Sequence, residues 1–169
     1  MAGLQIILFD VGGIACALRR SAARELLPLP RLWRPPGTPR PVAGFFNLSG
    51  TAVPVIRLDI LFGLELNKTA DAETDLYRHL ILVDSLTPSG RAALLVDRVL
   101  DVLQVEESTL SAVAPENTLN GCVEAEITHA SGLVHLLSIE RVLLAEEQQA
   151  LSELGRHAQS RLGEWALPA

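Results

Sequence analysis

Short apolar runs, only some of them alternating with polar residues, recur along most of this chain, and glycine, proline or polar residues separate them. Short runs of this kind between turn residues are typical of strands. The pattern predicts strands over residues 4–10, 14–18, 45–48, 52–56, 76–86, 92–96, 121–128 and 133–137. Turns at Gly12-Gly13, Gly50, Pro88-Ser89-Gly90 and Ala130-Ser131-Gly132 are expected to join them into hairpins. Many short strands with few helices between them predict small β-barrels.

The segments between these strands are less regular. We expect a short helical turn over 21–26, a proline-rich loop over 28–41 and a short helix over 60–64. Residues 67–75 and 108–120 are expected to be loops, and 96–105 is apolar at mixed spacing.

The C-terminal segment changes to a helical period, and we expect helix from residue 139 onward. Its apolar residues recur every three or four positions, at Leu151, Leu154, Ala158, Leu162 and Trp165. That spacing places them on one face of a helix, and an isolated helix of this length is marginal in water. The stripe therefore packs on the rest of its own chain, or else docks on a partner or a second copy. We predict a domain over 1–145 and a helical extension over 146–169.

An internal echo connects the two halves of the chain. The segment containing Val55 and Leu58 aligns at one fixed offset with the segment containing Leu136 and Ile139. Chance is one explanation in a chain so rich in aliphatic residues. The other is a pair of similar five-stranded barrels packed against each other.

Composition excludes several classes of function. The net charge is −6 and the pI is about 5.2, which argues against a nucleic-acid partner. The sequence offers no metal motif, cofactor loop or catalytic triad, so we expect neither an enzyme nor a cofactor. No apolar run is long enough for membrane insertion, and we expect no signal peptide. Cys16 and Cys122 lie in apolar runs and are expected to be reduced, buried thiols.

Three blocks of residues occur in the order of a known family pattern. The first is met by Val42, Gly44, Asn47, Leu48, Gly50, Val53, Pro54, Val55, Ile56, Leu58, Phe62 and Gly63. The second is met by Leu95, Val96, Asp97, Val99, Val102 and Leu103, and the third by Leu119 and Gly121. On these residues the chain resembles the CheW family, the adaptor proteins of bacterial chemosensory arrays. The resemblance covers roughly residues 4–144.

The resemblance implies a mainly β fold of two five-stranded SH3-like barrels and a non-catalytic, cytoplasmic adaptor. Its implied partners are the regulatory domain of a CheA-type histidine kinase and the cytoplasmic tip of a methyl-accepting chemoreceptor. We expect receptor contact near Phe46, Asn47, Ser49 and Gly50. Kinase contact is expected at the turns of Gly12, Gly13, Pro88, Ser89 and Gly90.

The chain also departs from the family pattern at charged positions. Ala43 and Ser49 stand where the family has arginine, and Arg57 and Asp59 exchange the signs of a family pair. These departures favour a divergent or non-flagellar pathway. Simpler roles remain open: Asn47 and Asp97 as side chains that cap or bridge backbone groups at strand ends, and Arg57–Asp59 as a solvated surface pair.

Strand alternation further predicts that only one of Phe45 and Phe46 lies on the core face, so that the other faces outward or packs against the proline-rich loop. A second hypothesis for the whole chain is a barrel that binds a small apolar molecule in the cleft between its halves.

Overall fold

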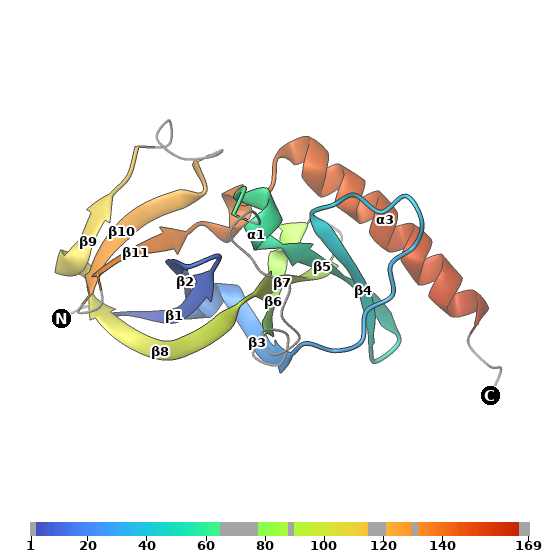
Figure 1. Cartoon of the computed structure of the whole chain (residues 1–169), viewed down its shortest axis with the longest axis horizontal. Coiled ribbons are helices and arrows are strands. Elements are labelled where there is room, and N and C mark those ends of the chain that lie inside the picture. The colour runs from blue at the N-terminus through green and yellow to red at the C-terminus, as the bar shows by residue number, and fades with distance from the viewer. Residues whose placement is uncertain (1–2, 65–77, 88–89, 115–120, 130–131, 166–169) are drawn as a thin grey trace.

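The chain forms two β-sheets and one long C-terminal helix (Figure 1). The computed structural model describes residues 3–64, 78–87, 90–114, 121–129 and 132–165. The predicted fold class, mainly β with two small β-units packed together and a C-terminal helix, is confirmed.

The first sheet combines strands from both ends of the chain in the order β8-β1-β2-β11-β10-β9. Its strands are β1 (Gly3–Val11), β2 (Ile14–Arg19), β8 (Arg98–Glu106), β9 (Leu110–Ala112), β10 (Val123–His129) and β11 (Gly132–Leu137). Neighbours are antiparallel except for β2 and β11, which are parallel.

The second sheet is built from the middle of the chain in the order β3-β6-β7-β5-β4. Its strands are β3 (Ala23–Pro28), β4 (Val42–Leu48), β5 (Thr51–Arg57), β6 (His79–Thr87) and β7 (Gly90–Val96). Here the parallel pair is β5 and β7. The short helix α1 (Leu58–Leu61) follows β5, as the 3-10 turn η6 (Ile139–Arg141) follows β11.

The two sheets share one connectivity, which explains the internal echo. In each, two hairpins meet through a parallel pair: β4–β5 meets β6–β7, and β10–β11 meets β1–β2. Val55 lies opposite Ala93, and Leu136, its counterpart in the echo, lies opposite Ala17. The echo is therefore a structural repeat. In the second sheet the hairpin β6–β7 follows β4–β5 along the chain, whereas in the first sheet the hairpin β1–β2 precedes β10–β11.

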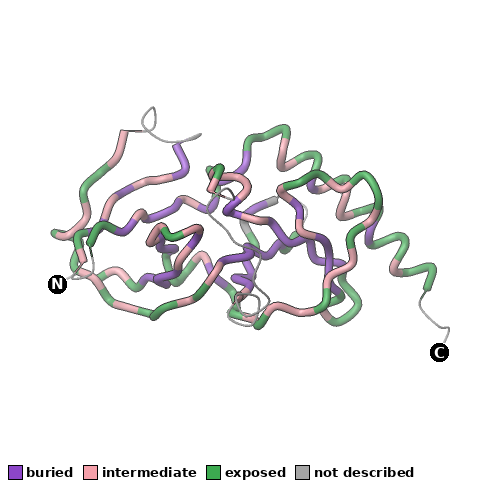
Figure 2. Tube along the Cα trace, viewed as in Figure 1, coloured by how far each residue is buried: buried purple, intermediate pink, exposed green. Residues whose placement is uncertain are grey.

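Three buried clusters hold the sheets together, and Figure 2 shows buried chain along both. One cluster belongs to the first sheet, with Ile6 and Leu136, and one to the second, with Val53 and Leu82. The largest takes residues from both sheets and from the C-terminal helix, Phe9 and Leu94 among them. Among the apolar strand residues that are buried are Val53, Val55, Leu95, Val96, Leu136 and Leu137.

The C-terminal helix α3 (Ala145–Glu164) packs on its own chain, against β5 and β6. Leu151 and Ala158 are buried in the shared cluster, with Leu154 and Leu162 packed beside them. At its start, the Leu144 N–H donates to Glu147 Oε1 (2.7 Å), the N3 half of a capping box. Trp165, the last member of the predicted stripe, is 79% exposed, so the packed stripe ends at Leu162.

Several predicted elements need correction. The helical turn over 21–26 is wrong: only η1 (Arg20–Ala22) is helical, and β3 follows because it pairs with β6. The loop over 108–120 contains η3 (Glu107–Thr109) and then β9, which gives the first sheet six strands rather than five. The predicted short helix lies earlier, at α1. Helix from 139 onward is interrupted between η6 and α3.

Neither phenylalanine of β4 is exposed, so the expectation of an outward ring is wrong and its alternative, packing against the proline-rich loop, is the one that holds. Phe46 is 5% exposed and faces the cluster of its own sheet. Phe45 is 1% exposed, lies in the shared cluster and contacts the ring of Trp33 from the proline-rich loop (centroids 5.9 Å apart). The predicted loop over 67–75, and the turn residues Ala130 and Ser131, lie outside the described residues.

Candidate functional site

The turn between β1 and β2 is the first of the predicted kinase contacts. Gly12 and Gly13 have φ of 56° and 84°, a conformation that favours glycine in two-residue hairpin turns. The Gly12 N–H donates to Asp97 Oδ2 (2.7 Å), and the Asp97 N–H donates to the Asp10 carbonyl (2.9 Å). Asp97 therefore ties this turn to the junction of β7 and β8, the bridging role that the sequence left open for it.

Asp10 and Asp97 bring two carboxyl groups close to this turn. Burial, followed by the negative charge of Asp97, raises the pKa of Asp10, while Arg98 acts to lower it. The charged groups of Asp10, Asp97 and Arg98 therefore lie close together beside this turn. Gly13 is exposed at the tip of the turn.

The turn between β6 and β7 is the second predicted kinase contact. Pro88 and Ser89 lie outside the described residues, and Gly90 is exposed at the start of β7. On the flanking strands, Asp84 pairs with Arg24 (3.1 Å) and with Arg91 (3.5 Å). Gly90 and the Gly12–Gly13 turn belong to different sheets. The hairpins β1–β2 and β6–β7 each pair in parallel with the other hairpin of their sheet, so the predicted kinase contacts occupy equivalent positions in the two halves.

The turn between β4 and β5 carries the predicted receptor contact. Ser49 and Gly50 have φ of 51° and 88°, and the Asn47 Oδ1 accepts a hydrogen bond from the Gly50 N–H (2.7 Å). Asn47, Ser49 and Gly50 are exposed together, whereas Phe46 is buried beneath them. Asn47 thus has the capping role that its residue type allows.

Helix α3 holds the same turn from the other side. The Gln159 Nε2 donates to the Gly50 carbonyl (3.0 Å), and the Ala52 N–H donates to Gln159 Oε1 (2.8 Å). No local pattern predicts this contact, because Gln159 lies more than a hundred residues from its partners. The predicted receptor surface and the C-terminal helix are therefore physically connected.

The Arg57–Asp59 pair is not a solvated surface pair, and that expectation is wrong. Arg57 donates from Nε to Asp59 Oδ1 (3.2 Å) and from an η nitrogen to Oδ2 (2.8 Å). Asp59 is 3% exposed, while the Arg57 side chain is 29% exposed. A buried carboxylate requires such a partner, so the exchanged signs form a structural pair at the start of α1.

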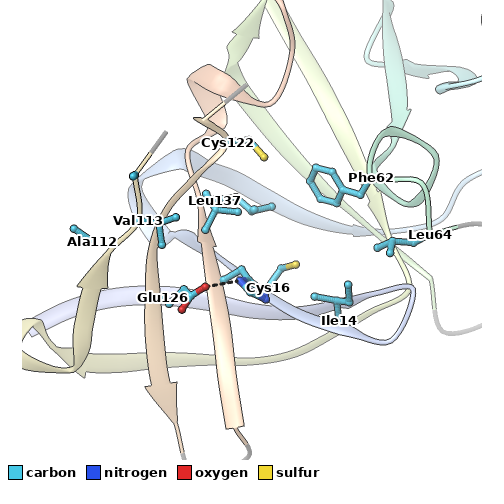
Figure 3. A pocket seen from close by; sticks show the side chains of 12 residues that line it. Ile14, Cys16, Phe62, Leu64, Ala112, Val113, Cys122, Glu126 and Leu137 are labelled. Carbon is cyan, nitrogen blue, oxygen red and sulfur yellow. Dashed lines mark ion pairs between the residues drawn. The ribbon is translucent and has the colours of Figure 1, made fainter. Parts of the chain in front are cut away.

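A cavity of about 540 Å³ lies between the halves, where the end of α1 meets β2, β10 and β11 (Figure 3). Its wall is mostly apolar, with Phe62 and Leu137 among its residues. The His135 Nδ1 lies 3.8 Å from Glu126 Oε1 there, and Figure 3 draws a dashed line from the Glu126 carboxylate.

Both cysteines also line this cavity, and both thiols are free. Burial, with smaller effects of Asp10 and Cys122, raises the pKa of Cys16 to about 12. Burial also raises the pKa of Cys122. Both groups are therefore thiols rather than thiolates near neutral pH, which makes them weak nucleophiles and weak metal ligands.

Within the part of the chain that the structure describes, no group of three or more His, Cys, Asp or Glu side chains is placed to hold a metal ion. In the same residues, no helix has the length and apolar character needed to span a membrane.

Comparison with protein families shows which family this two-sheet chain belongs to. The model of the CheW-like domain matches residues 5–147. The chain belongs to the CheW-like domain family. The CheW-like match covers both sheets and ends just after α3 begins, so most of α3 lies beyond it. The predicted division into a domain over 1–145 and an extension over 146–169 stays a prediction. Helix α3 contributes buried residues to the cluster that both sheets share.

A solved structure supports the CheW-like fold. The crystal structure of the scaffolding protein TtCheW from Thermoanaerobacter tengcongensis is similar with a TM-score of 0.73 and 21% identity. The similarity covers 87% of this chain and 92% of that one. At this identity the likeness concerns the fold alone. No curated protein matches the chain.

Proposed function

We propose that this protein is a non-catalytic adaptor that couples a chemoreceptor to a CheA-type histidine kinase in a chemosensory array. The observation that carries the proposal is the CheW-like match over both sheets. An adaptor needs two rigid surfaces of its own, one for each partner, rather than a reactive centre. The three buried clusters supply that rigidity. In this proposal the protein acts in the cytoplasm, at membrane-associated receptor arrays, without a cofactor.

The kinase regulatory domain is proposed to bind at the hairpin turns of Gly12–Gly13 and Pro88–Gly90. Arg91→Glu reverses an exposed charge beside Gly90, and Gly13→Asp adds a charge with a residue that tolerates positive φ. The variant at the true contact should no longer co-purify with the regulatory domain, while its circular dichroism spectrum stays native. Retained binding by both variants would exclude both turns.

The receptor tip is proposed to bind at the exposed turn of Asn47, Ser49 and Gly50, which Phe46 supports from below. Ser49 lacks the charge of the family arginine, so binding to an ordinary receptor fragment should be weak. Ser49→Arg should tighten it about 2- to 5-fold, the effect of one exposed ion pair. Ser49→Asn is the matched control, because asparagine tolerates the same backbone conformation without charge. Equal affinity of both variants would mean that this position does not contact the receptor.

The cavity between the halves favours a second candidate function, the binding of a small, mainly apolar molecule. Its volume of about 540 Å³ lies within the range of ligand sites. Ligand density in this cavity in a crystal grown from cell-purified protein would support this function. A cavity containing only water would argue against it.

A further inference from the structure

The turn between β4 and β5, which carries the proposed receptor contact, has a backbone conformation that needs support. Ser49 and Gly50 both have positive φ, as a tight two-residue hairpin turn of this kind requires. In the part of the chain that the structure describes, Ser49 is the one residue other than glycine with positive φ. A side chain disfavours that conformation, so the turn persists only where surrounding contacts hold it.

One of these contacts comes from the turn itself, and the neighbouring strand does not supply the other. Asn47 Oδ1 accepts the hydrogen bond of the Gly50 N–H, which caps the turn locally. On the other side of β5, pairing with the parallel strand β7 begins only at Val55. Ala52, near the start of β5, comes before that point. The first residues of β5 therefore extend past the strand beside them.

The side-chain amide of Gln159 takes the place of a neighbouring strand there. Its Nε2 donates to the Gly50 carbonyl (3.0 Å), and its Oε1 accepts from the Ala52 N–H (2.8 Å). An amide presents a donor and an acceptor side by side, as a strand backbone does. Gly50 is consequently bonded at both its backbone groups, the N–H by Asn47 and the carbonyl by Gln159.

Helix α3 fixes the point from which Gln159 reaches the turn. The adjacent Ala158 is buried in the cluster that both sheets share, and Leu162 packs beside that cluster. The turn remains open on its outer side, because Ser49 and Gly50 are exposed and a Cβ added to Gly50 would meet no atom within 4 Å. Gln159 lies beyond residue 147, where the CheW-like match ends, so the family pattern assigns it no role.

We propose that Gln159 is a positioning residue, through which helix α3 holds the β4–β5 turn in the conformation that the receptor tip binds. The inference rests on the proposed receptor contact. A turn that already has its bound conformation loses less entropy when the partner binds. If only a fraction of the molecules has that conformation, the apparent Kd rises in inverse proportion to the fraction. Loss of both Gln159 hydrogen bonds should therefore weaken receptor binding without removing any receptor contact.

Gln159→Met tests the inference, because methionine matches glutamine in length and helix propensity but has no amide. Gln149→Met is the matched control, since Gln149 is exposed on the same helix about 15 Å away along its axis. Amide hydrogen exchange, measured by NMR on the free full chain, reports the state of the turn. The Ala52 and Gly50 amides should exchange at least about 5-fold faster in Gln159→Met than in the wild type, and should be unchanged in the control. Gly50 is the decisive amide, because its N–H bonds to Asn47 and is released only if the turn itself loosens.

Calorimetric titration with a purified receptor cytoplasmic fragment gives the second readout. The Kd should rise at least about 3-fold in Gln159→Met and stay at the wild-type value in Gln149→Met. Unchanged exchange of the Gly50 amide in Gln159→Met, an unchanged Kd despite faster exchange, or an equal rise in Kd in both variants would overturn the inference and leave the proposed adaptor function standing. A wild-type protein that does not bind the fragment would instead contradict the proposed receptor coupling, and this inference would fail with it.

Discussion

Replacing Leu151 by alanine is the sharpest test of how the C-terminal helix is held. Leu151 is 3% exposed and belongs to the cluster shared by both sheets. Alanine is at least as good a helix former as leucine, so the substitution leaves the helix intact and removes only packing. The measured loss therefore reports the contact between α3 and the sheets.

The structure sets the size of the expected loss. Removing a buried leucine side chain costs about 2–5 kcal/mol, and the cost rises with the cavity that remains. A cavity of about 100 Å³ already lies beside Leu151, bounded by Ile56, Leu143 and Leu154. Since these neighbours have not closed that space, the substitution should enlarge it, and we expect a loss of about 3–5 kcal/mol.

Urea unfolding followed by far-ultraviolet circular dichroism measures this difference. Glu153→Ala is the matched control, because Glu153 is exposed on the same helix, and its free energy of unfolding should change by less than about 0.5 kcal/mol. The free energies should not depend on protein concentration. If Leu151→Ala unfolds like its control, α3 is not packed on its own chain in solution. A concentration-dependent loss would instead show docking on a second copy.

Three further outcomes follow from buried groups. Val55→Asp places a carboxylate at a position with no exposure and should cost about 4 kcal/mol or more, measured as a large fall in Tm. Because the pKa of Cys16 is about 12, its alkylation by iodoacetamide near neutral pH should be at least about 100-fold slower in the native protein than in concentrated urea, and equal rates would contradict its burial. The pKa of Asp10 is raised in the folded state, so the free energy of unfolding falls as pH rises from the ordinary carboxyl pKa to the raised one. Asp10→Asn should therefore raise Tm near neutral pH and leave it unchanged well below the ordinary carboxyl pKa.

Several strands were predictable because a short apolar run between turn residues is a local signal. Such runs located β1, β2, β4, β5, β10 and β11, and the echo between Val55 and Leu136 followed from their equivalent places beside a parallel neighbour. The apolar period of α3 likewise predicted which of its residues are buried, up to Leu162. In each case the pattern within one segment contains the necessary information.

The corrections arise where distant segments decide the outcome. The sequence around Glu25 does not alternate, and it becomes strand β3 only because β6 lies beside it. Asp59 is adjacent to a predicted strand end, but its burial depends on how α1 and Arg57 meet. One pocket of the second sheet is lined by Arg34, Arg40, Arg57 and Arg78, which no local pattern connects. Family resemblance indicated the adaptor role, and the receptor and kinase contacts expected from it stay predictions.

The central claim is that this chain links a kinase to a receptor, and co-sedimentation tests it most directly. Purified CheA-type kinase is mixed with a receptor cytoplasmic fragment assembled on vesicles, with and without this protein. The kinase should sediment with the vesicles only when this protein is present, and the amount should rise with its concentration until it saturates. Kinase that sediments equally without it, or stays in the supernatant at every concentration of folded protein, would contradict the adaptor role.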